Sequence, residues 1–168
     1  MGIYMGTTEI AASRTAGEIQ ELLAVSGAEA VEIKYERGQA SGIAFRIIRN
    51  GHPLHFSLPI RWKAVYRIME TAKAKSRGRT KKVDEGQARR TAWRQVLRWI
   101  EAQVALIDTN IVELEEVFLP YMQVDPDGTT FYQKAIKAGD LPALPAPKSE
   151  SSTMARIPGK KEANDETL

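Results

Sequence analysis

The 168-residue chain contains no cysteine and only two histidines. Without thiols it has no disulfide framework, no thiol nucleophile and no thiolate metal ligand, and this absence favours a cytosolic protein. His52 and His55 have no acidic residue at metal-ligand spacing on a helix, so no zinc site is expected. The sequence also lacks a glycine-rich phosphate loop and a nucleophile elbow. We therefore expect a protein that is not an enzyme and that carries no cofactor and no metal.

Long apolar runs are missing as well. No stretch approaches the ~18 consecutive apolar residues of a membrane-spanning helix. The N-terminal residues lack the basic and then apolar segments of a secretory signal. We therefore expect no membrane partner. The hydrophobic fraction of 43% is ordinary for a globular protein and is sufficient for one hydrophobic core.

The clearest local pattern lies between residues 30 and 58, where apolar and polar side chains alternate on both sides of Asn50-Gly51. Asn-Gly is a preferred pair for a two-residue hairpin turn. With the turn at this pair, six apolar side chains of the two strands face one side of a sheet. The expected cross-strand pairs are Ile47 with Leu54, Phe45 with Phe56, and Ile43 with Leu58.

A third strand precedes these two. A two-residue loop that starts at Gly38 would turn Ile33 to the opposite side of the sheet, whereas a three-residue loop keeps the apolar side chains on one side. The sequence therefore predicts a three-stranded antiparallel meander with one apolar face, which helices must cover. With the longer loop, the expected pairs are Ile33 with Phe45 and Tyr35 with Ile43.

One helix is expected before the strands along the chain, and a second one after them. Thr15 and Glu18 fit a capping box at the start of the first helix, which Gly27 ends. The second helix follows Pro59, where the side chains of residues 60–75 repeat at helical spacing. Its expected apolar side consists of Trp62, Val65, Tyr66 and Met69.

A long helical pattern then runs from Gln87 to Leu119 and ends at Pro120. Asp108–Asn110 either bends this helix or divides it, in which case Asn110 would cap a second one. An unbroken helix would measure roughly 45 Å, which is more than so small a domain needs. We therefore expect a homodimer in which the excess helix packs on a second copy of the chain.

These elements indicate an α+β protein in which the meander packs against an N-terminal helix and a long C-terminal helix. The single domain is expected to span residues 14–140, after an N-terminal arm at residues 1–13. It includes a basic linker at residues 76–86. Residues 141–168 are rich in proline, serine and lysine, a composition that is typical of a disordered tail.

The net charge of +3 hides two blocks of opposite sign. Residues 61–98 contain thirteen Lys or Arg and three acids, whereas residues 99–128 contain seven acids and no Lys or Arg. A concentrated basic segment is a candidate surface for nucleic acid, because phosphate contacts depend on local cation density and not on total charge.

Within the basic block, Arg90, Arg94 and Arg98 share one face of the expected helix. Cations near a helix N-terminus oppose the macrodipole, so their position there favours a role in binding phosphates, with a solvated helix face as the alternative. If they bind phosphates, changing all three to glutamate should abolish binding without unfolding the protein. The expected phosphate contacts are Arg77, Arg79, Lys81, Lys82, Arg89, Arg90, Arg94 and Arg98.

The three tryptophans divide between packing and stacking. Trp93 lies on the apolar stripe of the long helix and is expected in the core, with its indole N–H near the surface. Trp99 lies one position off that stripe, where it either packs against another helix or stacks on a nucleic-acid base. Trp62, which lies between two cations, is the other stacking candidate.

Five segments of the chain resemble a small, functionally unassigned family that is encoded by tailed phages and prophages. The resemblance extends over about residues 7–122, and no functional residue can be transferred from it. It implies a context in the cytoplasm of a host cell, in phage modules that contain DNA-handling proteins and inhibitors of host defence. The segments are TAGEIQ, FRIIRNG, LPIRWKAV, RRTAWRQVLRWIEAQVALI and EEVFLPYM.

The charge and this context together predict a non-catalytic nucleic-acid-binding protein, with single-stranded DNA as the first ligand, in phage replication or recombination. The alternative is a phage anti-defence protein, whose arginines would bind a host protein or a signalling nucleotide.

Overall fold

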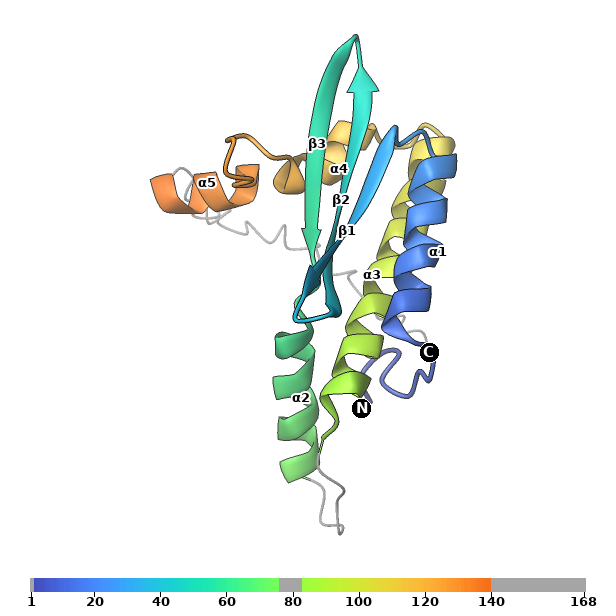
Figure 1. Cartoon of the computed structure of the whole chain (residues 1–168), viewed down its shortest axis with the longest axis vertical. Helices are drawn as coiled ribbons and strands as arrows, with labels where there is room; N and C mark the ends of the chain where they lie inside the picture. The colour runs from blue at the N-terminus through green and yellow to red at the C-terminus, as the bar shows by residue number, and fades with distance from the viewer. Residues whose placement is uncertain (1, 76–82, 140–168) are drawn as a thin grey trace, which may run out of the picture.

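The computed structural model describes residues 2–75 and 83–139. It contains one antiparallel sheet of three strands in the order β1 (Ala30–Glu36), β2 (Gln39–Arg49) and β3 (His52–Pro59). Figure 1 shows α1 (Ala12–Val25) and α3 (Glu85–Asp108) side by side next to this sheet. The α+β class and the three-stranded meander predicted from the sequence are confirmed.

The β2–β3 hairpin has the predicted register. Asn50 and Gly51 form the turn with φ angles of 52° and 77°. These left-handed values match the twist of the flanking strands, and glycine adopts them without steric cost. The predicted pairs are all present: Ile47 with Leu54, Phe45 with Phe56, and Ile43 with Leu58.

The predicted register of β1 was wrong by two residues at Ile33 and by three at Tyr35. Arg37 and Gly38 form a two-residue turn with φ angles of 50° and 72°, so the three-residue loop does not occur. Ser41 is an extra residue in β2 that has no partner in β1, and this bulge restores the alternation that the short turn would have broken. Ile33 pairs with Ile43, Tyr35 with Ala40 and Val31 with Phe45.

The apolar face of the sheet packs on α1, α3 and the short helix α4 (Leu114–Phe118). Phe45 and Phe56 stack at 4.9 Å between ring centroids, and Phe118 meets both rings edge-on. Trp93 is fully buried as predicted, but its indole N–H is not near the surface: it donates to the carbonyl of Ala40 at 3.3 Å. This bond joins α3 to β2 inside the core.

The predicted start of α1 was also wrong. The helix begins at Ala12, without a side-chain cap, so Thr15 and Glu18 lie inside it. Thr15 is buried and its hydroxyl donates to the carbonyl of Ala11 at 3.4 Å. Both residues instead face α3, where they contact Arg94.

The long helical pattern is divided, which was one of the two predicted possibilities. Helix α3 ends at Asp108, and Asn110 takes a left-handed φ of 55°. The N–H groups of Asn110 and Ile111 close the last turn, so Asn110 ends α3 and does not cap the next helix. The cap of α4 is Glu113. Helix α3 is therefore about 36 Å long, and the excess length from which a dimer was predicted is absent.

The remaining elements are α2, the one-turn helix η1 and α5. Helix α2 (Trp62–Ala74) extends beyond the end of the sheet and packs along the first turns of α3 (Figure 1). After α4, the one-turn helix η1 (Leu119–Tyr121) leads to Met122, which bridges to Phe56 on the edge of β3. A turn at Asp125–Gly128 precedes α5 (Phe131–Ala138), which begins with a capping box between Thr130 and Gln133.

Candidate nucleic-acid interface

The arginine face of α3 is largely covered, contrary to the prediction. Helix α1 packs against α3, and Arg94 is only 8% exposed there. Its guanidinium donates to the carboxylate of Glu18 and, at 3.5 Å, to the hydroxyl of Thr15. A buried cation with these partners holds two helices together. Arg94 therefore has little exposed surface for the predicted phosphate contact.

The N-terminal segment covers the neighbouring part of the same face. Residues 4–8 present their carbonyl groups to α3, and four side chains of α3 donate hydrogen bonds to them. These bonds join Gln87 to Gly6 and Thr8, Arg90 to Thr8, Thr91 to Met5, and Gln95 to Tyr4. Residues 4–8 of the predicted arm are thus part of the packed structure.

Arg90 and Arg98, the other two arginines of this face, are paired with acids. Arg90 lies 3.5 Å from the carboxylate of Asp84, and Arg98 lies 2.7 Å from that of Glu101. The hydrogen bond that Arg98 donates to the carboxylate of Glu101 raises the pKa of Arg98. Because each cation has an anion beside it, the face carries less free charge than the spacing of its arginines indicates.

Trp62 and Arg89 form a contact between α2 and α3. The guanidinium carbon of Arg89 lies 3.7 Å from the centroid of the Trp62 ring, and the ring of Tyr66 meets Trp62 edge-on. Arg89 therefore covers one face of the ring by a cation–π contact. The ammonium group of Lys63 also lies over the ring, 5.9 Å from its centroid, so two cations contact the ring that was predicted to stack on a base.

Five cations without carboxylate partners lie on α2 or at its ends, and the sequence-based choice of site residues missed them. Residues 61–75 contain five cations and a single acid, Glu70. Glu70 raises the pKa of the Tyr66 hydroxyl, chiefly because its carboxylate accepts a hydrogen bond from that hydroxyl. Among the described residues, no carboxylate lies within ion-pair distance of Arg61, Lys63, Arg67, Lys73 or Lys75. The excess of cations over acids in residues 61–75 is the sequence signal that could have identified these cations as candidate site residues.

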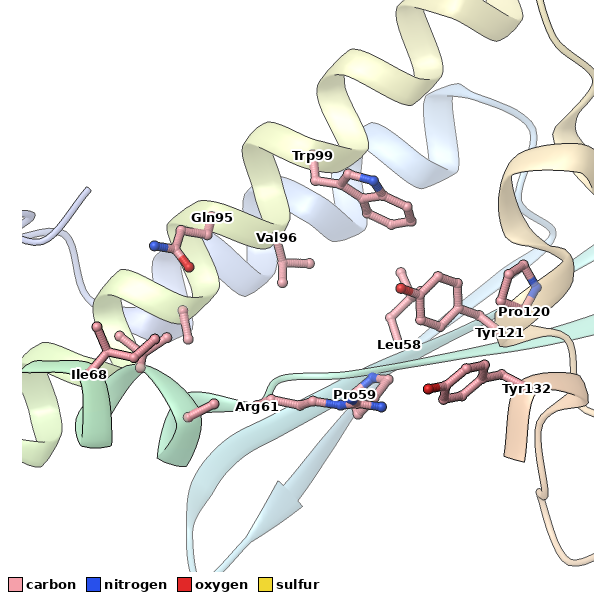
Figure 2. Close-up of a pocket in the computed structure, with 13 residues that line it drawn as sticks. Leu58, Pro59, Arg61, Ile68, Gln95, Val96, Trp99, Pro120, Tyr121 and Tyr132 are labelled. Atoms are coloured by element: carbon pink, nitrogen blue, oxygen red, sulfur yellow. The ribbon is translucent and has the colours of Figure 1, made fainter. Parts of the chain in front are cut away.

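An open groove of about 760 Å³ lies beside α2, and we call it the α2–α5 groove (Figure 2). Its walls come from the end of β3, from α2, α3 and η1, and from α5. The lining is mainly apolar and aromatic. Its polar or aromatic members are Arg61, Gln95, Trp99, Tyr121 and Tyr132.

Of the two roles that the sequence left open for Trp99, the structure shows packing, and stacking on a base stays a prediction. Its ring packs edge-on against Phe118 at 5.5 Å and Tyr121 at 5.6 Å between centroids, within the same chain. The side chain is half-buried and also lines the α2–α5 groove. Packing thus fixes the ring in the wall of an open groove.

Arg77, Arg79, Lys81 and Lys82, which the sequence also predicted as phosphate contacts, lie outside the described residues, as does the tail at residues 141–168. Within the described ranges, no group of three or more His, Asp or Glu side chains is placed to hold a metal ion. No helix of the same ranges is long and apolar enough to cross a membrane.

The chain was compared with family models, curated proteins and solved structures, and none of them matches it. Its candidate functional residues are therefore defined by its own geometry.

Proposed function

We propose that the protein binds single-stranded nucleic acid, with single-stranded DNA as the first ligand, and catalyses no reaction on it. The observation that carries the proposal is that three cations of residues 61–75 without carboxylate partners, Arg61, Arg67 and Lys75, line an open aromatic groove or the hollow next to it. Free cations bind the phosphate backbone by releasing its condensed counterions. Exposed aromatic rings next to them provide surfaces on which unpaired bases stack.

The length of the segment that carries these cations fits a strand of several nucleotides. Arg61 and Lys75 are fourteen residues apart in sequence, which corresponds to about 21 Å along a helix. In a stacked strand, successive phosphates are spaced about 3.4 Å along the helix axis, so this length spans several of them. The resemblance to phage-encoded proteins implies replication or recombination as the setting for such binding.

The proposal predicts a strong dependence of affinity on salt. With three phosphate contacts, from Arg61, Arg67 and Lys75, the logarithm of the binding constant should fall with a slope of about −2 against the logarithm of salt concentration. Affinity for a fluorescent fifteen-nucleotide thymidine oligomer should therefore fall about 20-fold between 50 and 200 mM salt. A change of less than twofold in an anisotropy titration would contradict the proposal.

Arg98 provides a contrasting prediction. Because Arg98 is paired with Glu101, replacing Arg98 by alanine removes a cation and frees an anion on α3, away from the cations of α2. We expect the Arg98→Ala protein to bind the same oligomer within about twofold of the unmodified protein. A tenfold loss of affinity would indicate that the interface lies on the arginine face of α3 and not on α2.

One observation favours the anti-defence alternative. The volume of the α2–α5 groove, about 760 Å³, is within the ~300–1,000 Å³ range of small-molecule sites. A thermal-shift screen of cyclic nucleotides tests it beside the oligomer titration. Stabilisation by a cyclic nucleotide without oligomer binding would support a protein that sequesters a signalling nucleotide.

A further inference from the structure

We infer that the α2–α5 groove is the base-binding site of this interface: it holds an unpaired nucleobase of the strand whose phosphates lie along α2. This inference rests on the proposed function, because it places the bases of the strand beside the cations that bind its phosphates. It assigns Tyr132 and Trp99 as the contacting aromatic side chains.

The charge around the groove matches a polyanion. A second hollow on α2 adjoins the groove, and the two share Ile68, whose side chain is 58% exposed. Arg61 lines the first hollow, and Arg67 and Lys75 line the second. Neither lining contains an aspartate or a glutamate. A strand that follows α2 would thus keep its phosphates on cations while its bases face an apolar surface.

The aromatic walls of the groove suit flat, partly polar rings. Figure 2 shows Tyr121 and Tyr132 pointing into the space between η1 and α2, with Trp99 above them on α3. The hydroxyl of Tyr132 points toward the side where Arg61 and Pro59 lie. Base stacking on such rings tolerates any sequence, because every base has a π-face.

The position of Tyr132 is fixed by the segment that carries it. Gln123 donates its N–H to the carbonyl of His55 at 2.7 Å, which attaches this segment to β3. Phe131 donates to the carbonyl of Met122 at 2.8 Å, and the capping box of Thr130 starts α5. The backbone that carries the ring is therefore fixed beside the groove before any ligand binds, which reduces the entropic cost of stacking.

Gln95 supplies a hydrogen-bonding group at the other end of the groove. Its amide nitrogen donates to the carbonyl of Tyr4 at 2.8 Å, which orients the side chain. Figure 2 shows the nitrogen turned away from the groove and the oxygen turned toward it. The oxygen is thus positioned to accept a hydrogen from the edge of a base.

The test compares two fifteen-nucleotide oligomers, one of thymidine and one in which every base is absent. The unmodified protein should bind the thymidine oligomer about tenfold more tightly than the abasic one. Tyr132→Ala should remove this difference by weakening only thymidine binding, and Tyr132→Phe should preserve it because the ring remains. The matched control is Phe131→Ala: Phe131 has the same 44% exposure on the same helix but does not line the groove.

The outcomes separate this inference from the proposed function. Equal affinities for the two oligomers, or an unchanged preference in Tyr132→Ala, overturn the base-binding site and leave the electrostatic interface standing. Equal losses in Tyr132→Ala and Phe131→Ala also overturn it. Absence of salt-dependent binding to either oligomer overturns the proposed function, and the base-binding site with it.

Discussion

Replacing Arg94 by alanine is expected to destabilise the protein by about 2–3 kcal/mol. The side chain is buried between α1 and α3, and its removal leaves the half-buried carboxylate of Glu18 with only the exposed Arg14 as a cation and the hydroxyl of Thr15 without a donor. Breaking a fully buried pair costs about 3–5 kcal/mol, and the partial exposure of Glu18 reduces that figure. The melting temperature should fall by about 5–10 °C in a calorimetric scan.

The control for this variant lies one turn further along the same helix. Arg98 also pairs with a glutamate, but both side chains are about 40% exposed, so Arg98→Ala should change stability by no more than about 0.5 kcal/mol. If Arg94→Ala keeps its melting temperature within 2 °C and loses oligomer binding, Arg94 is a ligand contact and the structural role assigned to it is wrong.

Helical periodicity placed the arginines of α3 correctly relative to one another, but it did not show what covers them. Four-residue spacing puts Arg90, Arg94 and Arg98 on one side of the helix, as the structure has them. Glu18, which neutralises Arg94, comes 76 residues earlier in the chain, in a different helix. Local spacing contains no information about such a partner. The unfavourable position of these cations in the macrodipole is offset by Asp84, Glu18 and Glu101.

The strands were predictable to the extent that their turns were. Asn50-Gly51 is an unambiguous turn signal, and the register of β2 and β3 followed from it. At the other turn, Arg37 takes a left-handed φ that non-glycine residues rarely adopt. The compensating bulge at Ser41 has no sequence signal of its own. The alternation fixed the face of each side chain but not its partner.

The candidate site could be predicted only in part, because its components come from distant segments. The excess of cations in residues 61–75 is visible in the sequence. The groove beside them needs Tyr132 and Tyr121 from the C-terminal part of the domain, and these reach it only because residues 122–123 pair with the edge of β3. No periodicity relates α2 to α5, so the groove is a property of the tertiary structure alone.

Reversing the charge of Arg61 and Arg67 together is expected to weaken binding of the thymidine oligomer by about 100-fold at 0.1 M salt. Both side chains are exposed and lie in the two adjoining hollows of α2. Each phosphate contact with a single strand releases about 0.7 counterion, so the loss of two contacts alone costs about 25-fold at this salt concentration. The two new carboxylates add repulsion. The salt slope should become shallower by about 1.4, which anisotropy titrations at several salt concentrations will measure.

The matched control reverses two lysines elsewhere, so that both double variants have the same net charge. Lys34 lies on the polar face of the sheet, where it donates to Ser57, and Lys137 lies in the last turn of α5. Neither lines the groove or the adjoining hollow. Similar losses in the two double variants would mean that net charge governs binding and that α2 is not the interface. A large loss and a shallower slope in Arg61→Glu/Arg67→Glu alone would locate the phosphate contacts on α2, because an unlocalised attraction depends on total charge and not on its position. Circular dichroism and melting curves that match those of the unmodified protein are required of both variants, so that a loss of fold is not taken for a loss of contact.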